Sequence, residues 1–139
     1  MEKDKSDLEA TMKQPYLSCD ERRALVEHYL GQTVRIEIDR PIGYVHHKEK
    51  YDLIYPINYG YIPGVLGGDA EELDVYLLGV GEAVTEYDAT IIGVVYRTDD
   101  VEDKLVGAPA GMHFTEEEIR AAVDFQERYH TSYIALAKQ

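Results

Sequence analysis

Apolar and polar residues alternate along the middle of the chain, a pattern typical of β-strands with one exposed face. In TVRIEID, residues 33–39, Val34, Ile36 and Ile38 share one side and charged residues share the other. Because side chains of a strand point alternately to its two faces, this segment is predicted to be a strand. Three further segments rich in β-branched residues, LDVYLLGV, ATIIGVVYR and KLVGAP, begin at positions 73, 89 and 104 and predict three more strands.

A helix is predicted towards each end of the chain. DERRALVEHYL follows an N-cap signal at Asp20 and stops at Gly31, so residues 1–31 are interpreted as a helical N-terminal extension. Near the C-terminus, FTEEEIRAAVDFQERYH has acidic residues in its first turn. Thr115 and Glu118 are spaced as a capping box, which marks the start of this second helix.

Two segments between these elements are harder to place. YPINYGYIPG, residues 55–64, contains two prolines and two glycines and is predicted to be too broken for a regular element. PIGYVHHKEK, residues 41–50, is predicted to be a loop or an irregular hairpin. About five short strands followed by one helix predict a mostly β, single domain spanning residues 1–139. We expect a closed or nearly closed β-barrel with helices packed outside it.

Composition narrows the class of partner. The chain has 139 residues, 45% of them apolar, and a net charge of -13, which argues against nucleic acid as a partner. It has no run of 18 apolar residues and no apolar leader, so neither a membrane span nor a secretory signal is expected. Cys19 is the only cysteine, which excludes an intrachain disulfide and a cysteine metal cage. A cytoplasmic protein is expected.

Acidic residues are concentrated in two short segments at predicted loop–strand junctions. DAEELD at 69–74 and DDVED at 99–103 contain four each, together eight of the 27 in the chain. Grouped carboxylates repel one another unless a cation offsets their charge, and oxygen-only ligands favour Mg²⁺ or Mn²⁺. The alternative is that the two segments are unrelated, solvated polar turns.

Other catalytic patterns are absent from the sequence. It contains no GxSxG nucleophile turn, no HExxH zinc motif and no GxxxxGK[ST] phosphate loop. The carboxylate clusters therefore remain the strongest indication of chemistry.

Several motifs resemble those of soluble family I inorganic pyrophosphatases. YPINYGYIP at 55–63, followed by DAEELDV at 69–75, is similar to that family's YPxNYGYIP-like stretch and DxDPxD signature. The segments at 36–38, 98–99 and 102–105 resemble its first active-site strand and its later metal and phosphate segment. The resemblance, which extends from about residue 33 to 130, implies an OB-like five-stranded closed barrel with a C-terminal helix over residues 32–139. It also implies metal-dependent hydrolysis of pyrophosphate to two phosphates by a metal-activated water.

The resemblance assigns roles to particular residues. Glu71 would help to deprotonate the attacking water, and Lys104 and Tyr59 would act on the phosphoryl oxygens. The implied ligands of Mg²⁺, or alternatively Mn²⁺, are Asp69, Asp74, Asp99 and Glu102, with Glu37 in the outer shell. The implied substrate-binding residues are Tyr55, Tyr59, Lys104, Tyr129 and Lys48.

The chain departs from the family pattern at several of these positions. Glu71 and Glu102 stand where the family has Asp, and Glu72 where it has Pro, and each added methylene would move a carboxylate by about 1 Å. The family's hairpin with a phosphate-binding arginine, just before residue 55, is expected to be deleted. The candidates to replace that arginine are Arg40, Lys48 and Lys50.

These departures leave two alternatives open. Loss of the hairpin would open the site to a larger phosphoanhydride, such as a nucleotide or a short polyphosphate. A reduced number of Lys and Arg side chains for phosphate binding is also compatible with an OB-like module that binds metal or phosphate without catalysis. The family resemblance further makes a homo-oligomer possible, and the role of residues 1–31 stays open.

Overall fold

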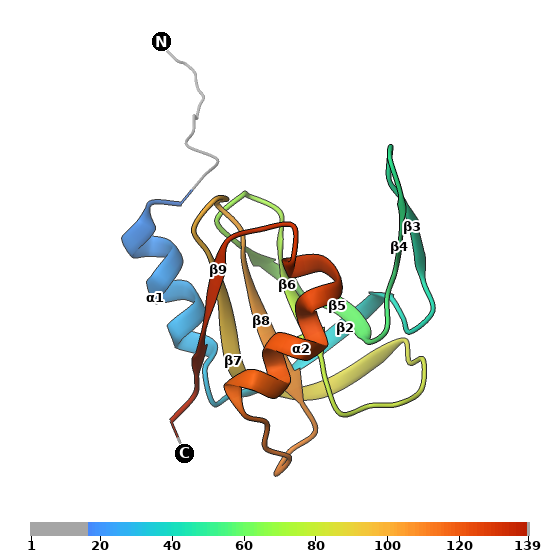
Figure 1. Cartoon of the computed structure of the whole chain (residues 1–139). Helices are drawn as coiled ribbons and strands as arrows, with labels where there is room; N and C mark the ends of the chain where they lie inside the picture. Colours follow the sequence, from blue (N-terminus) through green and yellow to red (C-terminus); the bar gives the residue numbers. More distant parts are fainter. Residues whose placement is uncertain (1–16, 139) are drawn as a thin grey trace.

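Five strands form a closed barrel in this computed structural model, which describes residues 17–138. In order around the barrel they are β2 (Thr33–Arg40), β5 (Asn58–Leu66), β6 (Glu72–Leu77), β8 (Asp103–Ala108) and β7 (Glu86–Arg97) (Figure 1). The barrel closes because β7 pairs with β2 as well as with β8. β6 and β8 are parallel, and the other neighbouring pairs are antiparallel. The predicted five-stranded closed barrel is confirmed.

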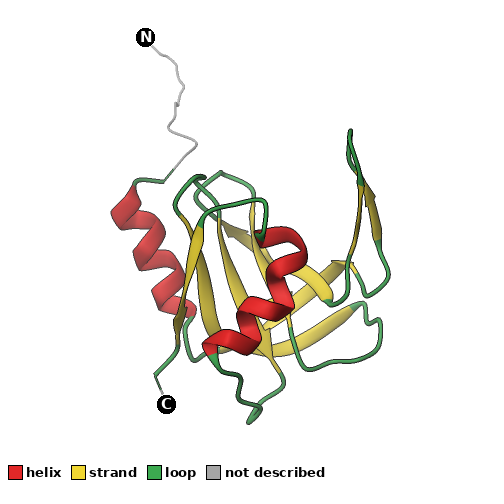
Figure 2. Ribbon diagram, viewed as in Figure 1, coloured by secondary structure: helices red, strands yellow, loops and turns green. Residues whose placement is uncertain are grey.

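Two helices and further strands lie outside the barrel. α1 (Cys19–Tyr29) and α2 (Glu116–Glu127), red in Figure 2, pack on its flanks. β9 (Ser132–Leu136) pairs with the outer part of β7, and a separate hairpin of β3 (Val45–His47) and β4 (Asp52–Ile54) stands away from the barrel. Within residues 17–138, no helix has the length and apolar character needed to cross a membrane.

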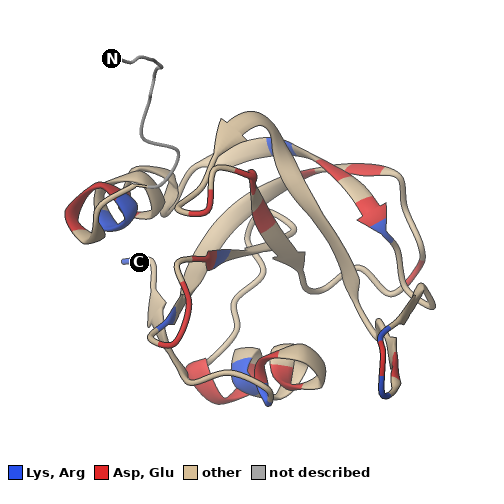
Figure 3. Cartoon of the chain, turned by 90° about the horizontal axis from the view of Figure 1, so that it is seen from above, with Lys and Arg blue, Asp and Glu red and all other residues tan. Residues whose placement is uncertain are grey.

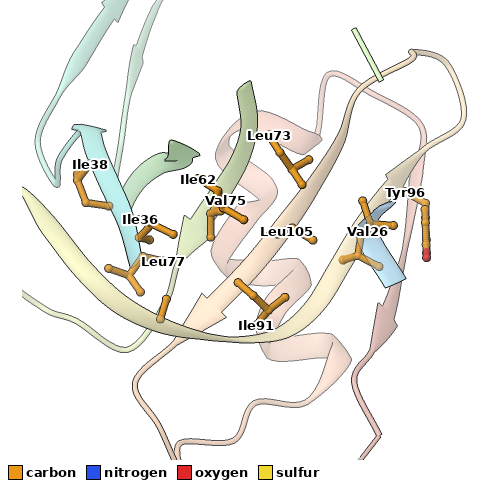
Figure 4. Close-up of a cluster of buried hydrophobic side chains, with 12 residues drawn as sticks. Val26, Ile36, Ile38, Ile62, Leu73, Val75, Leu77, Ile91, Tyr96 and Leu105 are labelled. Atoms are coloured by element: carbon orange, nitrogen blue, oxygen red, sulfur yellow. The ribbon is translucent and has the colours of Figure 1, made fainter. Parts of the chain in front are cut away.

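Two hydrophobic clusters stabilise this arrangement. Inside the barrel, aliphatic side chains such as Val75, Ile91 and Leu105 are fully buried (Figure 4). Between the barrel and α2 lies a second cluster rich in aromatic residues, including Tyr59 and Tyr76. We call these the aliphatic interior and the aromatic layer.

The local signals for β6 and α2 are confirmed. Leu73, Val75 and Leu77 belong to the aliphatic interior, while Tyr76 belongs to the aromatic layer, so the alternation along β6 is as predicted. The N-cap of α2 is Thr115, which forms the expected capping box with Glu118.

The prediction that residues 55–64 are too broken for a regular element is wrong, because β5 runs through most of them. Gly60 permits this pairing, since a Cβ at that position would clash with the Glu37 carbonyl oxygen of β2. Pro63 is exposed, in the part of β5 where the register with β6 shifts. A proline at an irregular position removes no hydrogen bond from a regular ladder.

Further differences concern the N-terminal helix and the hairpin. Ser18, not Asp20, is the N-cap of α1, because it forms a capping box with Glu21. Residues 1–16 of the expected extension lie outside the described residues. A hairpin formed by β3 and β4 lies just before residue 55, and its turn carries Lys48 and Lys50. β9 was not among the predicted strands; it is a short strand added at the edge of the sheet.

Candidate active site

The two acidic segments meet at one end of the barrel. The loop before β6 contains residues 67–71, the loop before β8 contains residues 98–102, and these parallel strands are neighbours. Both loops therefore lie at the same end, which Figure 3 views from above with acidic residues in red. α1 lies beside them in this view.

Lys104 lies at the centre of this end. The parallel register of β6 and β8 makes Asp74 and Lys104 neighbours across the sheet. The Lys104 ammonium donates to Asp74 Oδ2 at 2.6 Å, Tyr59 Oη at 2.9 Å and Glu102 Oε1 at 3.3 Å. Its side chain is only 4% exposed, so these partners compensate a charge removed from water.

A cavity of about 270 Å³, the cationic cavity, opens beside Lys104. Its lining residues are Arg40, Lys48, Tyr59, Asp74, Arg97, Asp100, Glu102, Lys104, Gln126, Tyr129 and His130. The four Lys and Arg side chains come from different parts of the fold and converge on this space. Such donors are suited to phosphate oxygens, since charge-assisted hydrogen bonds to phosphate are among the stronger polar interactions.

A second cavity of about 400 Å³, the acidic cavity, shares Asp74 and Glu102 with the first. Its other lining residues are Asp39, Tyr61, Glu71 and Glu72. Burial raises the pKa of Glu102, and a hydrogen bond with the Asp69 carboxyl raises it further, while Lys104 lowers it. Two carboxyl groups in contact indicate a local excess of negative charge.

The donor set of the acidic cavity fits a hard cation in its chemistry. Every candidate ligand is a carboxylate oxygen, which suits Mg²⁺ or Mn²⁺ better than Zn²⁺. As the side chains lie, no group of three or more His, Cys, Asp or Glu in residues 17–138 is arranged to hold a metal ion. Asp74 and Glu102 instead both accept hydrogen bonds from Lys104. To bind a metal ion, Asp74 and Glu102 must therefore replace their hydrogen bonds with the Lys104 ammonium by bonds to the ion.

Arg97, at the end of β7, connects the site with the buried side of α2. Its side chain is 3% exposed, and Nη2 lies 2.8 Å from Glu127 Oε2. On its other side Nη1 donates to Glu102 at 3.1 Å and to Asp100 at 3.3 Å. Burial by itself would lower the pKa of Arg97, but the Glu127 carboxylate raises it, so the guanidinium stays charged.

A chain of buried hydrogen bonds runs below the cationic cavity. Arg40 donates to Tyr55 Oη, which donates to Gln126 Oε1 at 2.8 Å. Gln126 Nε2 donates to Tyr76 Oη at 2.8 Å, and Tyr76 donates to Glu127 Oε2 at 2.6 Å. Through Glu127 the chain reaches Arg97. The two arginines of the cavity are thus joined through the aromatic layer.

Seven of the residues implied by the family resemblance, Lys48 included, line the cationic cavity or the acidic cavity next to it. Glu71 lies in the acidic cavity, and the others, Tyr59, Lys104, Asp74, Glu102 and Tyr129, line the cationic one. Lys48 also lines the cationic cavity, as does Arg40, one of the other candidates for the replaced arginine. Burial raises the pKa of Tyr59 well above its ordinary range, so its hydroxyl keeps a proton to donate.

The remaining implied residues lie elsewhere. Tyr55 is fully buried beneath the cavity, where it can position Arg40 but does not line the open space. Asp99 lines neither cavity and faces His130, with 3.4 Å between Oδ2 and Nδ1. Glu37 accepts a hydrogen bond at 3.1 Å from Tyr61, which lines the acidic cavity. Asp69 lies beside Glu102.

Sequence reasoning did not identify Arg97, Asp39 or Glu127, and it included Asp100 in the acidic segment 99–103 without giving it a role. A signal for Glu127 exists, because it continues the i, i+4 spacing of Ile119 and Val123 on the buried face of α2. A charged residue in a buried stripe predicts a charged partner. No comparable local signal identifies that partner as Arg97, which lies 30 positions away.

The chain was compared with models of protein families and with curated proteins. The family model described as inorganic pyrophosphatase matches residues 24–134. The chain is 33% identical over 96 residues to an inorganic pyrophosphatase of Saccharolobus solfataricus, covering 65% of this chain and 56% of the relative. It is 44% identical over 59 residues to one of Haemophilus influenzae, covering 40% and 34%. The chain thus spans about half the length, or less, of these curated relatives.

Solved structures share the fold. The crystal structure of inorganic pyrophosphatase from Ehrlichia chaffeensis has a TM-score of 0.61 at 15% identity, over 78% of this chain and 88% of that one. An inorganic pyrophosphatase from Neisseria gonorrhoeae has a TM-score of 0.53 at 23% identity, over 71% and 74%. These similarities support the OB-like fold independently of the sequence motifs.

Proposed function

The chain belongs to the inorganic pyrophosphatase family, and from this premise we propose that it hydrolyses inorganic pyrophosphate to two phosphates with divalent cations. The observation that carries the proposal is that a cationic and an acidic cavity share Asp74 and Glu102. Hydrolysis of a phosphoanhydride needs adjoining places for cations and for phosphate oxygens. The two cavities offer both.

The cationic cavity would bind the substrate. Arg40, Lys48 and Lys104 would pair with phosphate oxygens, and the hydroxyls of Tyr59 and Tyr129 would donate hydrogen bonds. In this proposal Arg40 takes the place of the family's hairpin arginine. Tyr55 positions Arg40 from below.

The acidic side would hold the cations. Asp69, Asp74 and Glu102 are the proposed ligands of Mg²⁺ or Mn²⁺, with Asp99 and Glu37 as further candidates. When bound, divalent cations lower the pKa of the attacking water and neutralise charge on the phosphates. Glu71, exposed at this cavity, would accept the proton of that water. Lys104 and Tyr59 would stabilise charge on the leaving phosphate.

Phosphate release from pyrophosphate, nucleoside triphosphate and tripolyphosphate in the presence of Mg²⁺ tests the proposal. We expect pyrophosphate to be the preferred substrate. Asp74→Asn should reduce kcat by more than the roughly 10- to 100-fold that loss of an outer partner of a metal ligand costs. Asp88→Asn, which alters an exposed ion pair with Arg35, is the matched control and should retain activity. Equal turnover of pyrophosphate and nucleotide, or an active D74N variant, would reject it.

A second candidate, hydrolysis of a nucleotide, is favoured by one observation. The ring of Tyr51 stacks on that of Tyr129, with centroids 4.9 Å apart, and both are partly exposed beside the cationic cavity. Exposed aromatic faces bind bases by stacking. Under this candidate, Tyr51→Leu lowers nucleotide hydrolysis and leaves pyrophosphate hydrolysis unchanged. Mn²⁺ binding without turnover of any substrate would instead indicate a binding module.

A further inference from the structure

We propose that Arg22 of α1 is a positioning residue that holds the two acidic loops at the spacing needed for cation binding. This inference rests on the proposed function of the acidic cavity. Arg22 precedes the residues 24–134 that match the family, so neither the family comparison nor the sequence motifs assign it a role. The structure places it at the junction of the two loops.

The first contact is with Asp103, the first residue of β8, which directly follows the acidic loop of residues 98–102. Arg22 Nη2 donates to Asp103 Oδ1 at 2.7 Å and Nε donates to Oδ2 at 3.2 Å, a two-pronged interaction between groups that are 14% and 5% exposed. Such a fork fixes orientation as well as distance. Asp103 Oδ1 also accepts the backbone N–H of Arg97 at 3.2 Å.

Asp103 transmits this constraint to the site by its position in the chain. It lies between Glu102 and Lys104, and side chains alternate between the two faces of a strand. Asp103 therefore points to α1 while its neighbours face the cavities. Removal of the guanidinium leaves an almost completely buried carboxylate without its cationic partner, which is unfavourable. In this proposal Asp103 then shifts, and Glu102 and Lys104 shift with it.

The second contact is with the loop before β6. The aliphatic part of Arg22 lies against Gly68, where a Cβ would be 2.9 Å from Arg22 Cγ and Cδ and would clash with the Val101 carbonyl. The Leu17 N–H donates to the Gly68 carbonyl at 3.3 Å. Gly68 directly precedes Asp69, a proposed metal ligand. One side chain of α1 thus contacts the loop before β6 and the residue of β8 that directly follows the other acidic loop.

The neighbouring arginine provides a matched control. Arg23 donates to Tyr133 Oη at 3.0 Å and lies over the ring of Tyr96, with 4.8 Å to the centroid. It occupies the next position on the same helix, but its hydrogen bond is to Tyr133 and not to Asp103. Substituting it perturbs α1 without releasing the acidic loops.

The test is Mn²⁺ binding to the full chain by titration calorimetry, with phosphate release measured in parallel. Arg22→Met, which keeps the aliphatic stem but loses the donors, should weaken Mn²⁺ binding about tenfold, comparable to losing an outer partner of a metal ligand. Asp103→Asn should weaken it similarly, and the double variant should be little worse than either single one, because the two residues act as a pair. Arg23→Met should bind Mn²⁺ as the unaltered chain does.

Two further readouts separate positioning from stability. Excess Mg²⁺ should restore kcat of R22M without changing KM for pyrophosphate, since Arg22 does not line the cationic cavity. Arg22→Lys keeps the positive charge but loses the two-pronged interaction, so its Mn²⁺ affinity should lie between those of R22M and the unaltered chain. It replaces R22M in the test if R22M does not fold. Unchanged Mn²⁺ affinity in R22M and R22K, or equal losses in R23M, would overturn the inference. Absence of pyrophosphate turnover by the unaltered chain would reject the proposed function but would leave the Mn²⁺ comparison decisive.

Discussion

The aliphatic interior and the aromatic layer lie on opposite sides of the same strands but use burial differently. In the interior, aliphatic side chains such as Val75 and Leu105 contribute only apolar contacts and carry no polar group that needs a partner. In the aromatic layer, Tyr55 and Tyr76 carry hydroxyls into a hydrogen-bond chain that ends at Arg40 and Arg97. Substitutions in the interior should therefore change the stability of the protein but not its activity. Substitutions in the aromatic layer should change both.

The largest effect is expected when Glu127, the most buried charged residue beside the aromatic layer, is removed. Glu127→Ala leaves the Arg97 guanidinium buried without its main partner, which should destabilise the protein by about 4 kcal/mol. Because Arg97 also contacts Glu102 and Asp100, kcat should fall at least about tenfold even for the folded fraction.

Urea denaturation and phosphate release measure both effects. Glu127→Leu combined with Arg97→Met removes both charges and should recover part of the stability but none of the activity. Full activity in E127A would show that the layer is not coupled to the site.

The matching change in the interior is Ile91→Ala. Ile91 is fully buried on β7, so its truncation should cost about 3 kcal/mol through lost burial and an unfilled cavity. The comparison predicts that kcat per folded molecule, measured below the unfolding transition, stays within about twofold, because the Ile91 side chain belongs to the aliphatic interior and lines neither cavity. A loss of kcat as large as in E127A would erase the distinction between the two regions.

A smaller change sharpens the role of the hydroxyls. Tyr76→Phe keeps the ring in the layer but removes the link between Gln126 and Glu127. Gln126 Nε2 then loses its acceptor, and Glu127 loses one donor but still accepts hydrogen bonds from Arg97. We expect a loss of about 1–2 kcal/mol in unfolding free energy and a measurable fall in kcat. Tyr87→Phe, on a partly buried tyrosine packed against the interior, is the control and should retain kcat.

The smallest expected effect concerns pH. Burial and Asp69 raise the folded-state pKa of Glu102 above its ordinary value of 4.5, so the folded state binds its proton more tightly than the unfolded state does. Without metal, the stability from this group is fully present below pH 4.5 and is lost as the pH rises through the folded-state pKa. In the Glu102→Gln variant, the midpoint of thermal unfolding should therefore decrease less as the pH rises.

In the presence of Mn²⁺, stability should instead increase as the pH rises, because cations bind the deprotonated carboxylate. The raised pKa of Asp39, caused first by burial, adds a decline in the same direction, so Asp39→Asn serves as the comparison variant. If the stability of E102Q depended on pH in the same way as that of the unaltered chain, the decline could not be assigned to Glu102.

Much of the fold was predictable because its strongest signals are local. The alternation at residues 33–39 and the capping box at Thr115 depend only on neighbouring residues, and both are confirmed. β5 was missed because glycine and proline normally disfavour strands, and only the approach of β2 shows why Gly60 is required. The N-cap was misplaced because Ser18 and Asp20 are both good caps, and the contact with Glu21 decides between them.

The site was predictable in part for the same reason. The acidic residues are clustered in sequence and are visible without a structure. The contact between Lys104 and Asp74 depends on the parallel register of β6 and β8, and the contact between Arg97 and Glu127 depends on how α2 crosses the barrel. Such contacts between distant positions follow from topology, which a single sequence does not specify locally.

Barrel closure between β2 and β7 also has a consequence for how the chain reaches its native state. The paired Thr33 and Thr90 are 57 positions apart, so their ladder forms only after much of the intervening chain has been ordered. Pairings this distant in sequence slow the search for the native topology, and refolding is expected on the millisecond-to-second scale rather than in microseconds. Until that ladder forms, the edges of β2 and β7 are open to pairing with another chain, so aggregation during refolding should increase with protein concentration.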